Sequence, residues 1–470
     1  MIANHMKSRL SFAALTATLV TLAGTGAVAQ AARAPVKEVL VSHIGWEVNK
    51  TKTEEGVPQA ERNICTVASK DVCQPGRESS QPGGFAYPKG VAVQTDPASA
   101  RPGDVYVADT VNNRVQELTA TGGFVSTFGV EGQAAGQLFS PRDVTVDPAA
   151  GNVYVNERGN NRVDEYTPDG AFVWMAGREV NKTKDETPGS SEAEKNLCTA
   201  ASLDVCTHGV QAPAGSSEHG AFNFSDLGRN VLAAGGPEDL LYVGDEHRVQ
   251  EFKADGTWVR EIPLAGGGVA ALAVDQTGDV YLAYEDRAHA QTAGAVVELD
   301  PNGQPLMEFP VAPSEPSAAI EIGTLALDSS GHLAVTALEG GRGILSRWFG
   351  SLYDAGTSHR ITEFSGAGPA GIAFSAGGDL YAAEAASAAT GHEVLSYKPV
   401  PVGELLSAPA ACKAGAEHET DVTFDCTLEG TVDAWGVKET EVWFQWGQTR
   451  ALGSETPKQP IANLKLECKE

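Results

Sequence analysis

The chain has 470 residues and a formal net charge of −27 at pH 7. So acidic a surface repels nucleic acids and anionic lipid headgroups, and we exclude both as partners. Its 52 glycines and 25 prolines, with only 4 methionines, favour many short strands joined by turns over long helices.

Residues 1–29 are typical of a secretory signal peptide. Lys7 and Arg9 precede the apolar run LSFAALTATLVTLAG, and an A-x-A cleavage site ends at Ala29. The run is shorter than the roughly 20 residues that a membrane helix needs. We therefore expect a secreted, monomeric protein without a membrane span in the mature chain.

A two-cysteine segment occurs twice, as NICTVASKDVC and NLCTAASLDVC. The copies each follow a copy of VNKTK, within polar inserts at 47–86 and 178–221. These inserts are too long for ordinary connections between strands, so each is either a functional loop or a floppy ornament.

Seven cysteines in an exported chain indicate disulfides. The spacing within the two segments is not a zinc spacing, so we predict a local disulfide in each. The predicted pairs are Cys65 with Cys73 and Cys198 with Cys206. A further trio, whose pairing the sequence leaves open, comprises Cys412, Cys426 and Cys468.

A longer repeat underlies these segments. DVYVADTVNNRVQELTATGGFVSTFG at 104–129 matches NVYVNERGNNRVDEYTPDGAFVWMAG at 152–177 throughout its length. Each copy reads, with the strand before it, as four alternating apolar strands whose turns carry Gly, Asp or Asn. Four antiparallel strands in a repeated unit of this length are typical of a β-propeller blade.

Weaker copies continue along the chain, and the last one lacks a fourth strand. They begin near residues 240, 272, 325 and 372, where LALDSSGHLAVTAL and RITEFS supply the fifth copy. EVLVSHIGWEVNKTK at 38–52 is similar to the fourth strand of the second copy, so we predict that this N-terminal strand closes the ring. The pattern predicts an all-β, six-bladed β-propeller over 35–400.

The strings VYVADTVNNRVQEL and PRDVTVDPAAGNVYVNERGNNRVDEY resemble NHL repeats, which occur in exported six-bladed propellers of bacteria. The resemblance is specific in the first two blades and covers about 35–400. In a bacterial exporter, the N-x-T glycosylation patterns at Asn49 and Asn181 are expected to be silent.

The pattern changes after residue 400. VWFQWGQTRALGSETP, within 423–457, resembles the fibronectin-type-III-like modules that follow such repeats in exported bacterial proteins. Residues 401–470 are therefore expected to form a short or incomplete fibronectin-III- or Ig-like module, because a β-sandwich usually needs about 100 residues. Its cysteines would compensate for a small core.

Carboxylates recur just after the second strand of several blades, where they would form a partial ring. Converging oxygens suit a hard cation, so one interpretation is a calcium- or sugar-binding mouth. The other, which we favour, is that each carboxylate pairs with the basic residue of its own loop, while the loop asparagines form turns. The candidate site residues are Asp109, Asn112, Arg114, Glu157, Asn160, Arg162, Asp245, Arg248, Glu285 and Glu384.

Two functions stay open, beside a third and weaker alternative, a structural surface protein whose acidity keeps it soluble. The first is an exported binding protein that uses the loop-bearing face to bind protein or carbohydrate. The second is a metal-dependent hydrolase or lyase, because lactonases and an amidating lyase occur on related propellers. The histidines recur at no fixed repeat position and no G-x-S-x-G is present, so no catalytic constellation is readable. Aromatic contacts to a partner, or packing between blades, are expected of Trp46, Trp174, Trp258, Phe85 and Phe222.

Overall fold

The computed structural model describes residues 36–52, 56–224, 231–264, 268–285, 294–311, 319–341, 344–354, 359–364, 369–384, 391–401 and seven short strands beyond residue 410. The predicted signal peptide lies outside these residues. No helix within them is long and apolar enough to cross a membrane. The described residues divide into two units, Lys37–Pro399 and the strands beyond Val400.

Five antiparallel sheets are each formed by strands that are consecutive in the chain. The first contains β3 (Pro88–Val93), β4 (Val105–Asp109), β5 (Arg114–Leu118) and β6 (Phe124–Phe128). The second contains β7 (Pro141–Val146), β8 (Val153–Glu157), β9 (Arg162–Tyr166), β10 (Phe172–Gly177) and β11 (Leu197–Thr199). The third contains β12 (Leu232–Gly235), β13 (Leu240–Gly244), β14 (Arg248–Phe252) and β15 (Trp258–Pro263).

The fourth sheet contains β16 (Gly268–Val274), β17 (Val280–Glu285), β18 (Ala295–Leu299) and β19 (Pro305–Pro310). The fifth contains β20 (Ala319–Leu327), β21 (His332–Gly341), β22 (Ile344–Asp354) and β23 (His359–Phe364). RITEFS thus forms the outermost strand of this sheet. Its third strand is β22, which the repeat pattern did not indicate because its sequence departs from the VQEL type.

One more sheet joins the two ends of this unit. It has the order β2-β1-β26-β25-β24, where β1 (Val36–Gly45) and β2 (Ile64–Thr66) meet β24 (Pro369–Phe374), β25 (Leu380–Glu384) and β26 (Glu393–Pro401). Ser42 and Ser396 share a hydrogen bond of 2.6 Å across β1 and β26. The predicted pairing of the N-terminal strand with the last copy of the repeat is therefore present.

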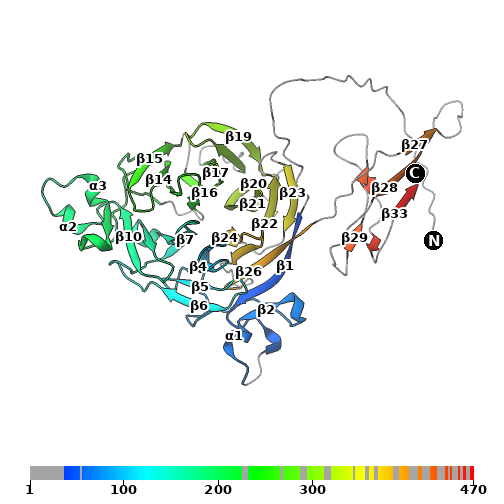
Figure 1. Cartoon of the computed structure of the whole chain (residues 1–470), viewed down its shortest axis with the longest axis horizontal. Helices are drawn as coiled ribbons and strands as arrows, with labels where there is room; N and C mark the ends of the chain where they lie inside the picture. The colour runs from blue at the N-terminus through cyan, green and yellow to red at the C-terminus, as the bar shows by residue number, and fades with distance from the viewer. Residues whose placement is uncertain are drawn as a thin grey trace. The chain divides into compact units, whose positions relative to one another are not determined.

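The sheets are arranged as a β-propeller around a common centre (Figure 1). Their innermost strands contact one another in the cyclic order β3, β7, β12, β16, β20, β24 and back to β3. The hydrophobic clusters lie between neighbouring sheets, as where Tyr106 and Val115 of the first sheet pack with Val144 and Val155 of the second. Five blades are contiguous in the chain, fewer than the six predicted.

The turn between the third and fourth strands of the second blade requires glycine for two reasons. Gly170 adopts a φ of +79°, and a Cβ atom there would lie 2.6 Å from Cβ of Phe128 in the preceding blade. A side chain would therefore be strained at this turn and would also collide with the neighbouring sheet. The TPDG turn positions one blade against the next.

The described residues of the two inserts, 47–52 with 56–86 and 178–221, are held by paired strands and disulfides, which corrects the idea of a floppy ornament. Each adds a fifth strand to its sheet, since β2 pairs with β1 and β11 pairs with β10. Their short helices are η1 (Lys50–Lys52), α1 (Gln59–Arg62), η2 (Val67–Ser69), α2 (Lys182–Asp185), α3 (Glu192–Lys195) and η4 (Ala200–Ser202). A further short helix, η3 (Arg158–Asn160), lies between β8 and β9.

The second unit contains only β-strands in its described part. They are β27 (Ala411–Ala414), β28 (Phe424–Gly430), β29 (Thr440–Val442), β30 (Gln445–Trp446), β31 (Ser454–Glu455), β32 (Gln459–Ile461) and β33 (Leu466–Lys469). The backbone register places Cys412 opposite Cys426 across β27 and β28. The side chains of these cysteines and of Cys468 lie outside the described residues, so their pairing stays open.

Candidate functional site

The repeated carboxylate and arginine close the hairpin between the second and third strands of a blade. Asp109 at the end of β4 lies opposite Arg114 at the start of β5, and their side chains are 2.8 Å apart. Glu157 and Arg162 repeat this arrangement in the next blade at 2.7 Å. Asp245 lies 3.4 Å from Arg248. The predicted pairing within each loop is thus present in three blades.

Each arginine also holds the connection that leads into its own blade. Arg114 donates to the backbone carbonyls of Ser80, Gln81 and Gly84, at 2.8 to 3.2 Å. Arg248 donates to the carbonyls of Glu218 and Ala221 in the corresponding connection. The arginine therefore joins two loops on one face of the propeller, a role that the sequence pattern alone did not indicate.

The remaining oxygens of these carboxylates are also occupied. Asp109 accepts hydrogen bonds from the Ala86 amide at 2.7 Å and from Asn112 at 2.9 Å. Asn160 donates to Glu157 at 2.9 Å, and the Phe139 amide donates to the same carboxylate at 2.5 Å. The carboxylates consequently have few free lone pairs for a cation.

Asn113 and Asn161 adopt positive φ values of 53° and 50°, as expected for residues that form the turn.

Burial dominates the electrostatics of these groups. Burial raises the pKa of Asp109 above its usual value, against the effect of the hydrogen bonds from Ala86 and Asn112. Burial and, next, the neighbouring Asp164 carboxylate raise the pKa of Glu157 well above its usual range. Buried carboxyl groups such as Asp109 and Glu157 hold a loop in place and are inaccessible to a ligand from the solvent.

The other predicted carboxylates do not join them in one site. Glu384 is buried at the end of β25, opposite Glu393, which is 2.8 Å from His43 of the N-terminal strand. Glu285 ends β17, and its side chain lies outside the described residues. Within the described part of the chain, no group of three or more His, Cys, Asp or Glu side chains is arranged to hold a metal ion.

The cavity that Asp245 borders has a volume of about 10 Å³, and Arg142, Asn156 and Arg158 also line it. That volume is about the size of one water molecule. A role in ligand binding for Asp245 and the other candidate site residues stays a prediction.

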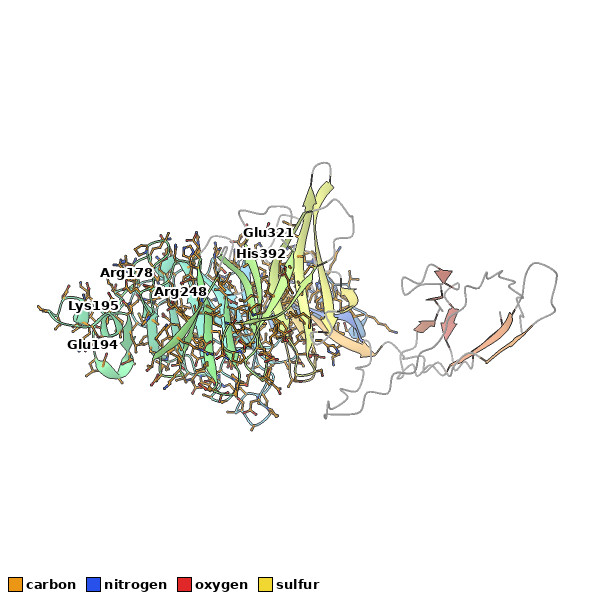
Figure 2. The ribbon with its side chains drawn as sticks, turned by 90° about the horizontal axis from the view of Figure 1, so that it is seen from above. Arg178, Glu194, Lys195, Arg248, Glu321 and His392 are labelled. Carbon is orange, nitrogen blue, oxygen red and sulfur yellow. A yellow bond between two sulfur atoms is a disulfide. The ribbon has the colours of Figure 1, made fainter. Side chains whose placement is uncertain are left out.

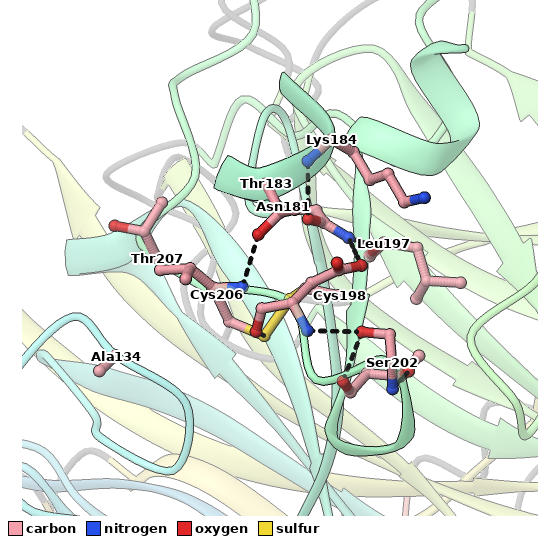
Figure 3. The surroundings of a disulfide bond; sticks show 12 residues. Ala134, Asn181, Thr183, Lys184, Leu197, Cys198, Ser202, Cys206 and Thr207 are labelled. Atoms are coloured by element: carbon pink, nitrogen blue, oxygen red, sulfur yellow. Dashed lines mark hydrogen bonds between the residues drawn. A yellow bond between two sulfur atoms is a disulfide. The ribbon is translucent and has the colours of Figure 1, made fainter. Parts of the chain in front are cut away.

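The two cysteine segments form equivalent modules, defined here as residues 46–85 and 177–222. The predicted disulfides are present, with Cα separations of 5.5 Å for Cys65–Cys73 and 5.7 Å for Cys198–Cys206. Asn181 donates from Nδ2 to the Leu197 carbonyl and to Asp204, and its Oδ1 accepts from the Lys184 amide (Figure 3).

Asn49 makes the same contacts in the first module, with the Ile64 carbonyl and with Asp71. The VNKTK copies are therefore structural, because their asparagine connects the start of the module to both sides of its disulfide loop.

A pocket of about 430 Å³ lies between the second module and the outer edge of the third blade. Its module wall includes Asn181, Lys184 and Asp204, and Trp258 of β15 forms part of the opposite wall. His219 stacks on the Trp258 ring with 3.5 Å between the ring centroids and 6° between the planes. Figure 2 shows the α3 residues Glu194 and Lys195 at the outer rim of the propeller, away from Arg248.

The sequence singled out Trp258 but not the polar residues around it. The disulfides were the only signal that the module has a fixed surface. Of the other aromatic candidates, Trp174, Phe85 and Phe222 are buried in the packing of the blades, and Trp46 is half-buried.

No known family profile and no curated protein match this sequence. The solved structures to which this chain is similar include hydrazine synthase of Kuenenia stuttgartiensis, at 11% identity and a TM-score of 0.39, over 65% of this chain and 76% of that one. Streptogramin B lyase is similar at 12% identity and a TM-score of 0.38, over 68% of this chain and 96% of that one. U3-55K is similar at 11% identity and a TM-score of 0.41, over 71% and 88% respectively.

Proposed function

We propose that this chain is an exported protein that binds protein or carbohydrate through the loop-bearing face of a six-bladed, NHL-type propeller. The closed ring of contacts among the innermost strands supports counting the composite sheet of β1 and β24–β26 as the sixth blade. The signal-peptide pattern and the two disulfides support export. The second unit, residues 401–470, is proposed to be a fibronectin-III-like spacer or second contact.

One observation carries the binding function. Leu203, at the tip of the second module, is 91% exposed and adopts a φ of 57°. A leucine in this left-handed conformation costs roughly 1 kcal/mol, and its exposed side chain adds nothing to the core. Val205 beside it is also exposed, as is Val72 at the matching position of the first module. An apolar tip on a disulfide-closed loop suits contact with a partner.

The enzyme alternative has less support. A metal-dependent hydrolase or lyase would need carboxylates that can take up a cation, whereas Asp109, Glu157 and Asp245 already accept hydrogen bonds from arginine. No observation in the described residues favours it over binding.

The test uses the variant Leu203→Gly, because glycine relieves the strain at this position and removes the apolar side chain. The purified chain is applied to a glycan microarray and to a displayed library of random peptides. We expect at least one ligand class to be selected, and we expect L203G to bind it several-fold more weakly at unchanged or higher thermal stability.

Lys70→Gly is the matched control, since Lys70 occupies the same left-handed position in the first module. It should leave binding by the second module unchanged. Selection of no ligand from either collection, or wild-type affinity in L203G, would overturn the proposal.

A further inference from the structure

The pocket beside the second module combines an aromatic wall with polar side chains of both charges. Asp204 and Glu194 contribute carboxylates, and Lys184 contributes an ammonium group. An anionic ligand would face the two carboxylates, and a cationic ligand would face Lys184. The lining therefore favours a ligand without net charge that can both donate and accept hydrogen bonds.

The polar groups are held in place before any ligand arrives. Asn181 fixes Asp204 at 2.8 Å, and Asn196 is anchored through Glu218 and the His219 carbonyl at 3.0 and 2.9 Å. Ser191 and Glu194 form a capping box at the start of α3. The disulfide closes the segment that carries Thr199 and Ser202. A preorganised lining of this kind lowers the entropy lost on binding.

Trp258 supplies the second, independent observation. Its Nε1–H is buried and donates to no acceptor among the described residues. By contrast, Nε1 of Trp174 donates to the Ala254 carbonyl at 2.9 Å. A buried indole N–H usually has a partner, so an oxygen brought by a ligand would complete this one. His219 is exposed and stacks on this ring, so a ligand that reaches the indole N–H would have to replace the imidazole.

We infer that this pocket binds a neutral sugar, as a monosaccharide or a short terminal unit of a glycan. The volume of about 430 Å³ falls within the range of small-ligand sites. The C–H face of a pyranose packs on an aromatic ring, while its hydroxyls pair with the Asp204 carboxylate and with amide and hydroxyl groups. This inference rests on the proposed binding function and names the ligand class of the second module.

The experiment is isothermal titration of the full chain with a panel of neutral mono- and disaccharides, followed in parallel by tryptophan fluorescence. We expect one sugar to bind, and we expect Ala193→Trp and Trp258→Ala each to weaken it at least tenfold. Ala193 is exposed and lines the pocket, so the larger side chain fills the space and leaves the core intact. Thermal melts confirm that both variants fold.

Ala60→Trp is the matched control, because Ala60 holds the same place in α1 of the first module and is also exposed. It should bind the sugar with wild-type affinity. Failure of every sugar in the panel, or unchanged affinity in A193W, would overturn the inference. If peptides whose binding depends on Leu203 still bind in that case, the proposed function stands and only the sugar site is overturned.

Discussion

Glu157 and Arg162 face each other across the β8–β9 hairpin at 2.7 Å, and neither side chain is exposed to solvent. The guanidinium also lies 2.9 Å from Asp164 and donates to the carbonyls of Gln133 and Thr207. A single arginine thus balances two buried carboxylates and holds the connections at both edges of its blade.

Replacing this arginine should be among the most damaging changes in the propeller. Arg162→Met leaves Glu157 and Asp164 buried without a cation, which costs about 3–5 kcal/mol. Urea denaturation followed by circular dichroism measures the loss. Arg114→Met is the comparison, because Arg114 is 13% exposed and water can replace part of its contacts, so its loss should be smaller. Equal losses in the two variants would contradict this account.

The N-x-T patterns should stay unmodified even in a host that glycosylates. Nδ2 of Asn49 and of Asn181 is already bonded, and both residues are 2% exposed. We expect no glycan on either after secretion from a eukaryotic cell, as measured by mass spectrometry of the intact chain. Gln304→Thr creates an N-x-T pattern at the exposed turn residue Asn302 and serves as the positive control. A glycan on Asn181 would contradict this prediction.

The Cys198–Cys206 disulfide should stabilise the second module locally. Closing so short a loop contributes about 2–3 kcal/mol, because it restricts the unfolded chain. In Cys198→Ala with Cys206→Ala, we expect faster amide hydrogen exchange over 180–206 and weaker sugar binding. The same change at Cys65 and Cys73 should leave exchange over 180–206 unaltered. Uniformly faster exchange in all blades would argue against a local role.

Acid should stabilise the propeller through Glu165. Burial raises the pKa of this carboxyl to about 7, with a hydrogen bond from Asn152 opposing the shift. The folded protein then holds a proton that the unfolded chain releases near pH 4.3, so the contribution of Glu165 to the free energy of unfolding is highest below that pH and is lost as pH rises through about 7.

Glu165→Gln mimics the protonated form and should remove up to about 3 kcal/mol of this dependence between about pH 4.5 and 8. Denaturant titrations at several pH values measure the slope. Glu186→Gln, at an exposed position, should leave the slope as in the wild type. If E165Q kept the full wild-type slope, another group would have to cause the pH dependence.

Much of the fold could be read from local patterns. The period-two alternation and the turn glycines predicted the strands of the first two blades, because a half-buried strand and a tight turn each need particular residues. The fifth sheet was harder, since β22 carries no repeat motif and is recognised only by its pairing with β21 and β23. The ordered structure of the modules could not be predicted from local patterns either. It depends on hydrogen bonds between residues that are distant in the sequence, such as Asn49 and Asp71.

The candidate site shows the same division. The sequence indicated that Asp109 and Arg114 belong together, because they flank one short loop. It could not indicate that Trp258 stacks on His219, 39 positions earlier, or that a pocket opens beside Asp204.

By itself, the sequence determined the repeated strands, the loop ion pairs and the two local disulfides, since each depends on residues that are close together along the chain. Only the tertiary structure decided that the inserts add fifth strands to two sheets, that β22 is the third strand of the fifth sheet, and that the second module and the third blade enclose a pocket. The reason is physical: pairing between strands and the shape of a pocket depend on which distant surfaces are buried against each other, and no local residue pattern specifies that choice.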